Sequence, residues 1–326
     1  MLKLISLSAL CGTVIAVSAA NADTCSARAH FAVVVHGGEL SQIMTDNGRL
    51  PAMKAALTDA RAKLAAGASS LDVVETIVRS FEDSGKFNAG RGAIADRAGL
   101  VETDASIMDG NGLRSGAVAS MTAIKNPVHA ARLVMEQTPH VLLVGDRGQD
   151  YVKKLGAETV TTDYFENTDH PKPAPEHGAK AEHGTVGAVA LDRCGHIAAA
   201  TSTGGYDAKI PGRVGDSPIV GAGVYANDDV AGFSATGHGE YFIRFSISKD
   251  VADRMKYGGM SMHDAMAADL KGELMNYKDG DGALIGIDKN GHVEMMWNAV
   301  GMFRGYATDS EAPVVAEYDG PTASGD

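Results

Sequence analysis

Residues 184–205, which read GTVGAVALDRCGHIAAATSTGG, contain the strongest fold signal in this chain. Two apolar runs flank a polar turn at 192–195, a pattern typical of an antiparallel hairpin of buried strands. Residues 283–297, ALIGIDKNGHVEMMW, repeat this plan with the same Asp-x-x-Gly-His turn. Strands that follow one another without an intervening helix predict antiparallel sheets.

Other segments predict further strands and the helices that cover the sheets. The apolar, β-branched run 31–35 indicates a strand buried on both faces, and it leads into a loop at 36–38. We also expect strands around the turn 109–112 and at 140–145, 218–225 and 230–236, and helices that begin near Pro51 and at Ser69 or span 127–137, 147–155, 240–257 and 261–276. The whole pattern predicts an α+β fold, a four-layer αββα sandwich in which two mainly antiparallel sheets lie between helical layers.

Composition and charge narrow the class of protein. The chain has 326 residues, of which 44% are hydrophobic and 21% charged, as in ordinary soluble globular proteins. Its formal net charge is −12, and its basic residues are spread thinly along the chain. A nucleic-acid partner is therefore not expected, because phosphate binding needs a clustered basic face.

The first residues predict an export signal. Lys3 supplies a positive start, residues 4–17 form a short apolar core, and ANA at 20–22 is a small-x-small cleavage site. The apolar run is too short to span a membrane comfortably, so no membrane partner is expected. We therefore expect residues 1–22 to be removed and the mature protein to be periplasmic or secreted.

Two cysteines follow the predicted signal. In an oxidising compartment Cys25 and Cys194 either form a disulfide or remain two free thiols, and the sequence leaves both alternatives open. Their spacing fits no zinc pattern.

The segment 162–184 loses all periodicity, contains three prolines and predicts an exposed, mobile loop that ends directly before Thr185. A threonine hydroxyl is a poor nucleophile unless a base lies beside it, and a free α-amine on the same residue is such a base, with an ordinary pKa of about 7.7–8.0. That amine exists only if the Gly184–Thr185 bond is broken, and glycine tolerates the strained geometry that such a bond needs. Taken alone, however, Gly-Thr-Val-Gly is also a common start of a structural strand.

A family resemblance decides between these interpretations. HGTVGAVALD (183–192), AAATSTGG (198–205), PGRVGDSPIVGAG (211–223) and ATGHGE (235–240) are similar to the isoaspartyl peptidase/L-asparaginase family, the plant-type asparaginases among the N-terminal-nucleophile hydrolases. VHGG (35–38), FNAGRGA (87–93), DASIMDG (104–110) and NPVHAARLVME (126–136) resemble the same family, in the same order.

The resemblance implies a precursor that cuts itself between Gly184 and Thr185. An α chain, residues 23–184, and a β chain, residues 185–326, would stay associated as halves of one domain and form a dimer of αβ units. Thr185 would be the nucleophile in both self-cleavage and catalysis, and Thr203 would form hydrogen bonds near its amine and hydroxyl.

The resemblance also assigns residues to the rest of the site. Thr236 and Gly237 match the family's oxyanion hole. Arg213 and Asp216 match the residues that hold the free aspartyl head of the substrate, since a guanidinium binds a carboxylate and a carboxylate binds an ammonium. The remaining assignments are the loop residues Val214 and Gly215, the carbonyl of Gly239, and Asn88 as a supporting residue near the nucleophile.

The loop 81–91 resembles one that binds a structural sodium ion through backbone carbonyls, here those of Phe87 and Ala89. It departs from the family pattern at Arg91, where an apolar residue is commoner. No other cofactor is expected.

The resemblance implies hydrolysis of L-asparagine and of β-aspartyl dipeptides. A first alternative is a glycosylasparaginase, which the residue Gly184 disfavours because that branch typically has aspartate before the nucleophile. A second is a secreted protein that keeps its chain intact and only binds aspartyl ligands. A third is a protease that cuts larger polypeptides.

Overall fold

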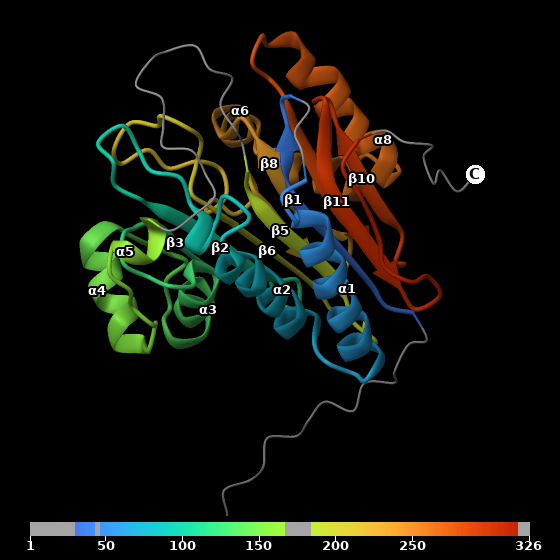
Figure 1. The fold of residues 1–326 in the computed structure, drawn as a ribbon. Coiled ribbons are helices and arrows are strands. Elements are labelled where there is room, and N and C mark those ends of the chain that lie inside the picture. Colours follow the sequence, from blue (N-terminus) through green and yellow to red (C-terminus); the bar gives the residue numbers. More distant parts are fainter. Residues whose placement is uncertain (1–29, 43–45, 167–183, 319–326) are drawn as a thin grey trace, which may run out of the picture.

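Two β-sheets form the centre of the molecule (Figure 1). The structure is a computed structural model that describes residues 30–42, 46–166 and 184–318. The larger sheet has eight strands in the order β12 (Val314–Ala316), β11 (Gly301–Thr308), β1 (Ala32–Leu40), β5 (Val186–Leu191), β6 (Ile197–Thr203), β2 (Thr103–Asp109), β3 (Arg114–Met121) and β4 (Leu142–Val144). The smaller sheet has the order β10 (Val293–Trp297), β9 (Gly282–Asp288), β8 (Ala231–Gly237) and β7 (Val224–Asn227). Among these described strands the β3–β4 pair alone is parallel, so the prediction of two mainly antiparallel sheets is confirmed.

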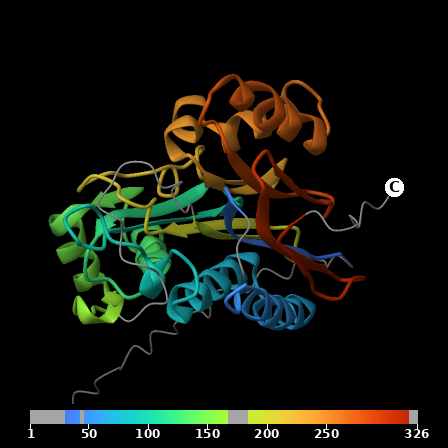
Figure 2. The same ribbon diagram turned by 45° about the horizontal axis from the view of Figure 1, so that its top comes forward.

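Helices cover the outer face of each sheet (Figure 2). The larger sheet is covered by α1 (Arg49–Ala65), α2 (Ser70–Ser84) and α3 (Pro127–Gln137), with α4 (Gly145–Leu155) beside β3 and β4. The smaller sheet is covered by α6 (Gly239–Phe245), α7 (Ile247–Lys256) and α8 (Met262–Ala267), which continues as a π-helical turn (Ala268–Glu273) and a 3₁₀ turn (Leu274–Asn276). The order of layers is helices, sheet, sheet, helices, as the α+β pattern predicts.

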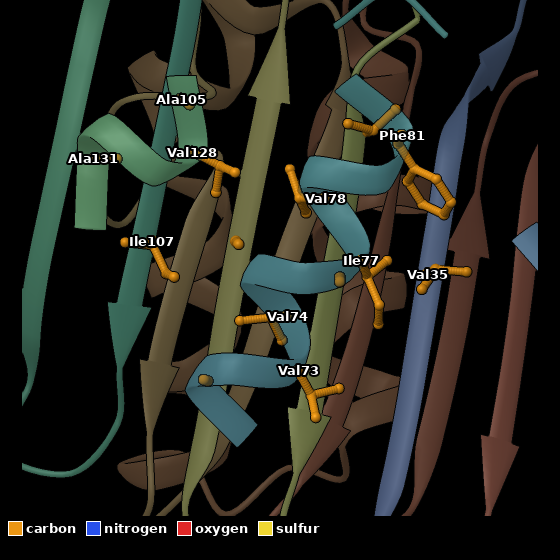
Figure 3. Close-up of a cluster of buried hydrophobic side chains, with 14 of the residues drawn as sticks. Val35, Val73, Val74, Ile77, Val78, Phe81, Ala105, Ile107, Val128 and Ala131 are labelled. Carbon is orange, nitrogen blue, oxygen red and sulfur yellow. The ribbon is translucent and has the colours of Figure 1, made fainter. Parts of the chain in front are cut away.

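Two hydrophobic clusters hold these layers together, and β1 contributes to both. Val33 and Val35 belong to the cluster between the larger sheet and its helices. Figure 3 shows Val35 beside Ile77 and Phe81 of α2 in this cluster. Val34 belongs instead to the cluster between the two sheets. Because successive side chains of a strand point to opposite faces, an unbroken apolar run such as 31–35 is buried on both sides.

Local signals place the helix ends where the sequence predicts them. The Ser69 hydroxyl accepts a hydrogen bond from the Asp72 N–H and caps α2, and Ser261 does the same for Asp264 at the start of α8. Each cap satisfies one of the backbone donors that a helix start leaves unpaired.

Four predictions of local structure were wrong in detail. Residues 36–38 are not a loop, because β1 continues to Leu40 across an irregularity in register between His36 and Glu39. The predicted helix 240–257 is two helices, since Ser246 adopts a left-handed conformation with φ 51° between α6 and α7. The strand expected at 218–225 begins at Val224. Part of the predicted loop 162–184 is helical, with a short helix α5 at Asp163–Glu166.

Several predictions lie outside the described residues, including the signal peptide 1–22 and most of the segment before Thr185. Cys194 is disulfide-bonded, while Cys25, its considered partner, is not among the described residues. Within the part of the chain that the structure describes, no helix has both the length and the apolar character needed to cross a membrane.

Candidate active site

A small pocket lies where β5 begins and where β6 and β8 end. Thr185 directly precedes β5, Thr203 is the last residue of β6, and Gly237 is the last residue of β8. The pocket is lined by Thr185, Thr203, Gly205, Tyr206, Arg213, Asp216, Ser217 and Gly237. The two sheets therefore bring together residues from four of the predicted motifs.

Thr185 and Thr203 face each other across the β5–β6 pair. Val186 is opposite Ser202 in the strand register, which places the two threonines at neighbouring strand ends. The Thr185 hydroxyl donates to the Thr203 Oγ1 at 3.1 Å, and both side chains are buried. Thr203 also accepts a hydrogen bond from the Gly205 N–H at 2.9 Å, so its position is set from two sides.

Asn88 supports this corner of the pocket. Its amide nitrogen donates to the Gly205 carbonyl at 2.6 Å, and its amide oxygen accepts from the Ile94 N–H at 3.0 Å. A Cβ on Gly184 would lie 2.7 Å from the Cβ of Asn88. Glycine is thus required before Thr185 by this close approach, a reason that the sequence does not reveal.

Gly237 lines the pocket from the other sheet, and Thr236 precedes it on β8. Gly237 has φ 139°, and a Cβ there would lie 2.5 Å from the Cα of Gly282. Thr236 is fully buried, and its Oγ1 accepts a hydrogen bond from the Glu39 N–H at 3.3 Å. Since a hydroxyl that accepts one bond keeps its own proton for donation, Thr236 can donate to a third group.

Arg213 is held by a carboxylate that sequence reasoning missed. Its Nε donates to Glu240 Oε1 at 3.1 Å and its Nη2 donates to Oε2 at 3.0 Å. The guanidinium also stacks on the Tyr206 ring, with 4.3 Å from Cζ to the ring centroid. Burial would lower the pKa of Arg213, but the hydrogen bonds and charge of Glu240 outweigh it and raise the pKa above its ordinary value. Glu240 is the last residue of the ATGHGE motif, and its place in that motif was the one sequence feature that could have marked it as a site residue.

Asp216 is a buried carboxylate whose Oδ2 has no hydrogen-bond partner among the described residues. Burial raises its pKa to about 7, and the nearby charge of Arg213 lowers it only in part. An unpaired buried carboxylate oxygen is costly, and a cationic ligand group would satisfy it.

Glycines allow Arg213 and Asp216 to approach each other. A Cβ on Gly239 would lie 2.7 Å from Asp216 Oδ1 and 2.9 Å from Arg213 Nη2. A Cβ on Gly215 would lie 2.6 Å from Arg213 Nη1. Val214, which follows Arg213 in the sequence, is half-buried. The predicted GRVGD loop thus places a guanidinium, which can bind an anion, and a carboxylate, which can bind a cation, in the same pocket as the two threonines.

The predicted sodium loop contains Asn88 between Phe87 and Ala89. The Phe87 carbonyl accepts from the Ala89 N–H at 2.8 Å, and the Ala89 carbonyl accepts from the Gly92 N–H at 3.1 Å. Each carbonyl has a second lone pair that could bind a cation. Arg91 lies 5.9 Å above the Tyr164 ring in a cation–π contact. Over the described residues, no group of three or more His, Cys, Asp or Glu side chains is arranged to hold a metal ion.

Comparison with known proteins gives a consistent result. The model of the asparaginase family matches residues 29–317. The isoaspartyl peptidase of Escherichia coli (strain K12) is 40% identical over 315 residues, which cover 90% of this chain and 98% of that protein. The isoaspartyl peptidase of Salmonella typhimurium is 44% identical over 78% of this chain and 86% of its own length. The human isoaspartyl peptidase/L-asparaginase is 39% identical over 83% of this chain and 91% of its own length.

Proposed function

The chain belongs to the asparaginase family, and we propose that it hydrolyses L-asparagine and β-aspartyl dipeptides. The observation that carries this proposal is the pocket in which Thr185 lies beside Thr203 and shares its walls with Arg213 and Asp216. Enzymes of this family need no cofactor, and the proposed chemistry uses side chains and backbone alone.

The proposal includes activation by self-cleavage before Thr185, as in N-terminal-nucleophile hydrolases. In the uncut chain the pocket is a cavity of about 10 Å³, which is room for about one water molecule. An aspartyl group cannot enter such a space. We infer that the pocket must widen before substrate binds, and that the cut before Thr185 creates the free amine.

The catalytic steps follow from the groups around Thr185. Its amine takes the hydroxyl proton, and Oγ1 attacks the amide carbonyl carbon of the substrate side chain. The Gly237 N–H and the Thr236 hydroxyl stabilise the oxyanion. The amine returns the proton to the leaving nitrogen, which departs as ammonia or as the amine of the released amino acid. Water then cleaves the acyl ester and releases aspartate.

The α-carboxylate and α-ammonium that the two substrates share explain why both fit one site. Asparagine and an N-terminal β-aspartyl residue each carry a free α-carboxylate and a free α-ammonium on the same carbon. The Arg213 guanidinium would bind the carboxylate, while Asp216 and the Gly239 carbonyl would bind the ammonium. An aspartyl residue linked through its α-carboxyl lacks the free carboxylate, so it would not be bound.

Three expectations remain part of the proposal. A sodium ion held by the carbonyls of Phe87 and Ala89 would stiffen the loop that carries Asn88. Residues 1–22 would direct export to the periplasm or the exterior. The α and β chains would remain associated and pair as a dimer of αβ units.

Amino-terminal sequencing and intact mass of the purified mature protein test the proposal directly. We expect two polypeptides, of which one begins Thr185-Val186-Gly187. The same preparation should release ammonia from L-asparagine and leucine from β-aspartyl-leucine. A single uncut chain that binds aspartate without turnover would instead indicate the binding protein, and preferential turnover of glycoasparagine would indicate a glycosylasparaginase.

A further inference from the structure

His36 is a fully buried histidine that connects three strands behind the nucleophile. It lies on β1, and its Nδ1 is 3.1 Å from the carbonyl oxygen of Thr185. Its Nε2 is 2.9 Å from the Ser234 Oγ on β8 of the other sheet. The ring therefore joins the residue before β5 to the second sheet, and none of the proposed catalytic steps uses it.

The space for this ring depends on Gly187, the second glycine of the GTVG motif. Gly187 is opposite His36 in the β1–β5 register. A Cβ on Gly187 would lie 2.4 Å from His36 Nε2 and 1.9 Å from Ser234 Oγ. Any side chain at this position would therefore displace either the imidazole or the serine that holds it.

The partners of the ring determine which nitrogen carries the proton. Burial lowers the pKa of His36 to about 3, so the ring is neutral and has one N–H. The Thr185 carbonyl can only accept, so Nδ1 is the protonated nitrogen and Nε2 accepts from the Ser234 hydroxyl. The Ser234 Oγ also lies 2.7 Å from the Thr201 Oγ1. The Ser234 hydroxyl and the His36 ring thus form two consecutive hydrogen bonds that end at the Thr185 carbonyl.

We propose that His36 is a positioning residue for the nucleophile: its Nδ1–H holds the Thr185 carbonyl and thereby fixes the orientation of the Thr185 amine and hydroxyl. This inference rests on the proposed function. The paired stretch of β1 and β5 ends at His36 and Gly187, so Thr185 lies beyond the ladder. Once the chain is cut, Thr185 is a terminus, and unrestrained termini fray. The hydrogen bond from His36 to the Thr185 carbonyl keeps the residue in place. A displacement of a reacting group by about 1 Å can lower the rate about 100-fold.

Two substitutions of His36 separate positioning from general packing. In His36→Asn the amide can occupy the place of Nδ1 and donate to Thr185, while in His36→Gln it occupies the place of Nε2 and reaches Ser234 only. We expect His36→Gln to lower kcat for asparagine by roughly 10–100-fold with KM within about twofold, and to slow self-cleavage similarly. His36→Asn should retain kcat within about fivefold, although both variants lose the imidazole. Equal effects of the two substitutions, whether both harmless or both damaging, would overturn the proposal.

A spectroscopic measurement tests the contact without relying on turnover. In ¹⁵N-histidine-labelled full-length protein at pH 7.5, the ring signals of His36 are those that disappear in His36→Asn. They should show a protonated Nδ1 and an unprotonated Nε2, and Ser234→Ala should shift the Nε2 signal. A protonated Nε2 would overturn the proposal. If wild-type protein neither cuts itself nor turns over substrate, the proposed function fails, and this measurement still decides whether His36 holds Thr185.

Discussion

The hydroxyl oxygens of Thr185 and Thr203 lie 3.1 Å apart, at the ends of two strands that neighbour each other in the larger sheet. The hydrogen bond is buried, so water does not compete with it. Because Thr203 also accepts from the Gly205 N–H, it offers a fixed oxygen toward which the Thr185 hydroxyl is directed.

Removing the Thr203 hydroxyl should impair catalysis without unfolding the protein. Thr203→Val keeps the shape of the side chain and loses the oxygen that fixes Thr185. We expect kcat to fall by about 10–100-fold while KM for asparagine changes little, since the aspartyl head site is untouched. Steady-state kinetics on the mature protein provides the measurement. Thr203→Ser retains the hydroxyl and should keep most of the activity, and equal losses in the two variants would contradict the assignment.

Substitution of Thr185 should affect processing and turnover together. Thr185→Ala has no hydroxyl, so denaturing gel electrophoresis should show one uncut chain, and no ammonia should be released. Thr185→Ser retains both the hydroxyl and, after cleavage, the amine, and should show slower but detectable processing. Retained turnover by Thr185→Ala would mean that another group is the nucleophile.

Glu240 should influence substrate binding through Arg213. Glu240→Gln removes the charge that holds the guanidinium at two points. We expect KM for asparagine to rise about tenfold with little change in kcat, because a charge-assisted hydrogen bond contributes about 1.5–3 kcal/mol. A matched control is Glu158→Gln, which removes a carboxylate from an ion pair with Lys125 at the surface and should leave KM unchanged. A purely catalytic defect in Glu240→Gln would argue against a role in binding.

Asp216 should make substrate capture depend on pH. Burial raises its pKa to about 7, so at pH 6 most of the free protein carries a protonated Asp216 that cannot bind an ammonium as an anion. We expect the ratio of kcat/KM between wild type and Asp216→Asn to fall about tenfold from pH 8 to pH 6. The ratio isolates this group because both proteins share the Thr185 amine. A ratio that does not change with pH would contradict the prediction.

The raised pKa of Asp216 should also make the stability of the folded protein depend on pH. The pKa of Asp216 in the folded protein lies above its ordinary value of 3.8, so the folded state binds this proton more tightly than the unfolded state. The contribution of Asp216 to stability is therefore largest below about pH 4 and is lost as pH rises through about 7. Asp216→Asn should raise the Tm at pH 8 more than at pH 5, while abolishing tight substrate binding.

Gly187 should tolerate no side chain. In Gly187→Ala the new Cβ would lie 1.9 Å from Ser234 Oγ and 2.4 Å from His36 Nε2. We expect a loss of about 1–3 kcal/mol in the free energy of unfolding, as for other overpacked cores, together with slower self-cleavage. Chemical denaturation measures the first effect. Gly272→Ala is a suitable control, because the nearest heavy atom to its new Cβ would be 3.8 Å away, and it should leave both properties unchanged.

The elements of this protein could be predicted wherever the signal is local. The helix expected at 127–137 matches α3, and the hairpin expected from 184–205 matches β5 and β6. Wrong boundaries arose where tertiary contacts override local preference. Residues 36–38 looked like a glycine loop, but pairing of Glu39 and Leu40 with β11 extends β1 beyond them. The left-handed Ser246 that divides α6 from α7 has no signal in the sequence.

Some residues of the site could likewise be predicted from local sequence, whereas others are brought together only by the tertiary structure. Thr185 and Thr203 lie 18 positions apart and are neighbours because a hairpin connects them, and two apolar runs around a polar turn were enough to predict that hairpin. The contact of Glu240 with Arg213 joins residues 27 positions apart, and the contact of His36 with Thr185 joins residues 149 positions apart, so no local pattern predicts either pairing. Apolar patterning determines which faces of strands are buried, and so it can be read along one chain. Which polar groups meet inside depends on how two sheets are packed face to face, because hydrogen bonds require distances of about 3 Å that no one-dimensional pattern specifies.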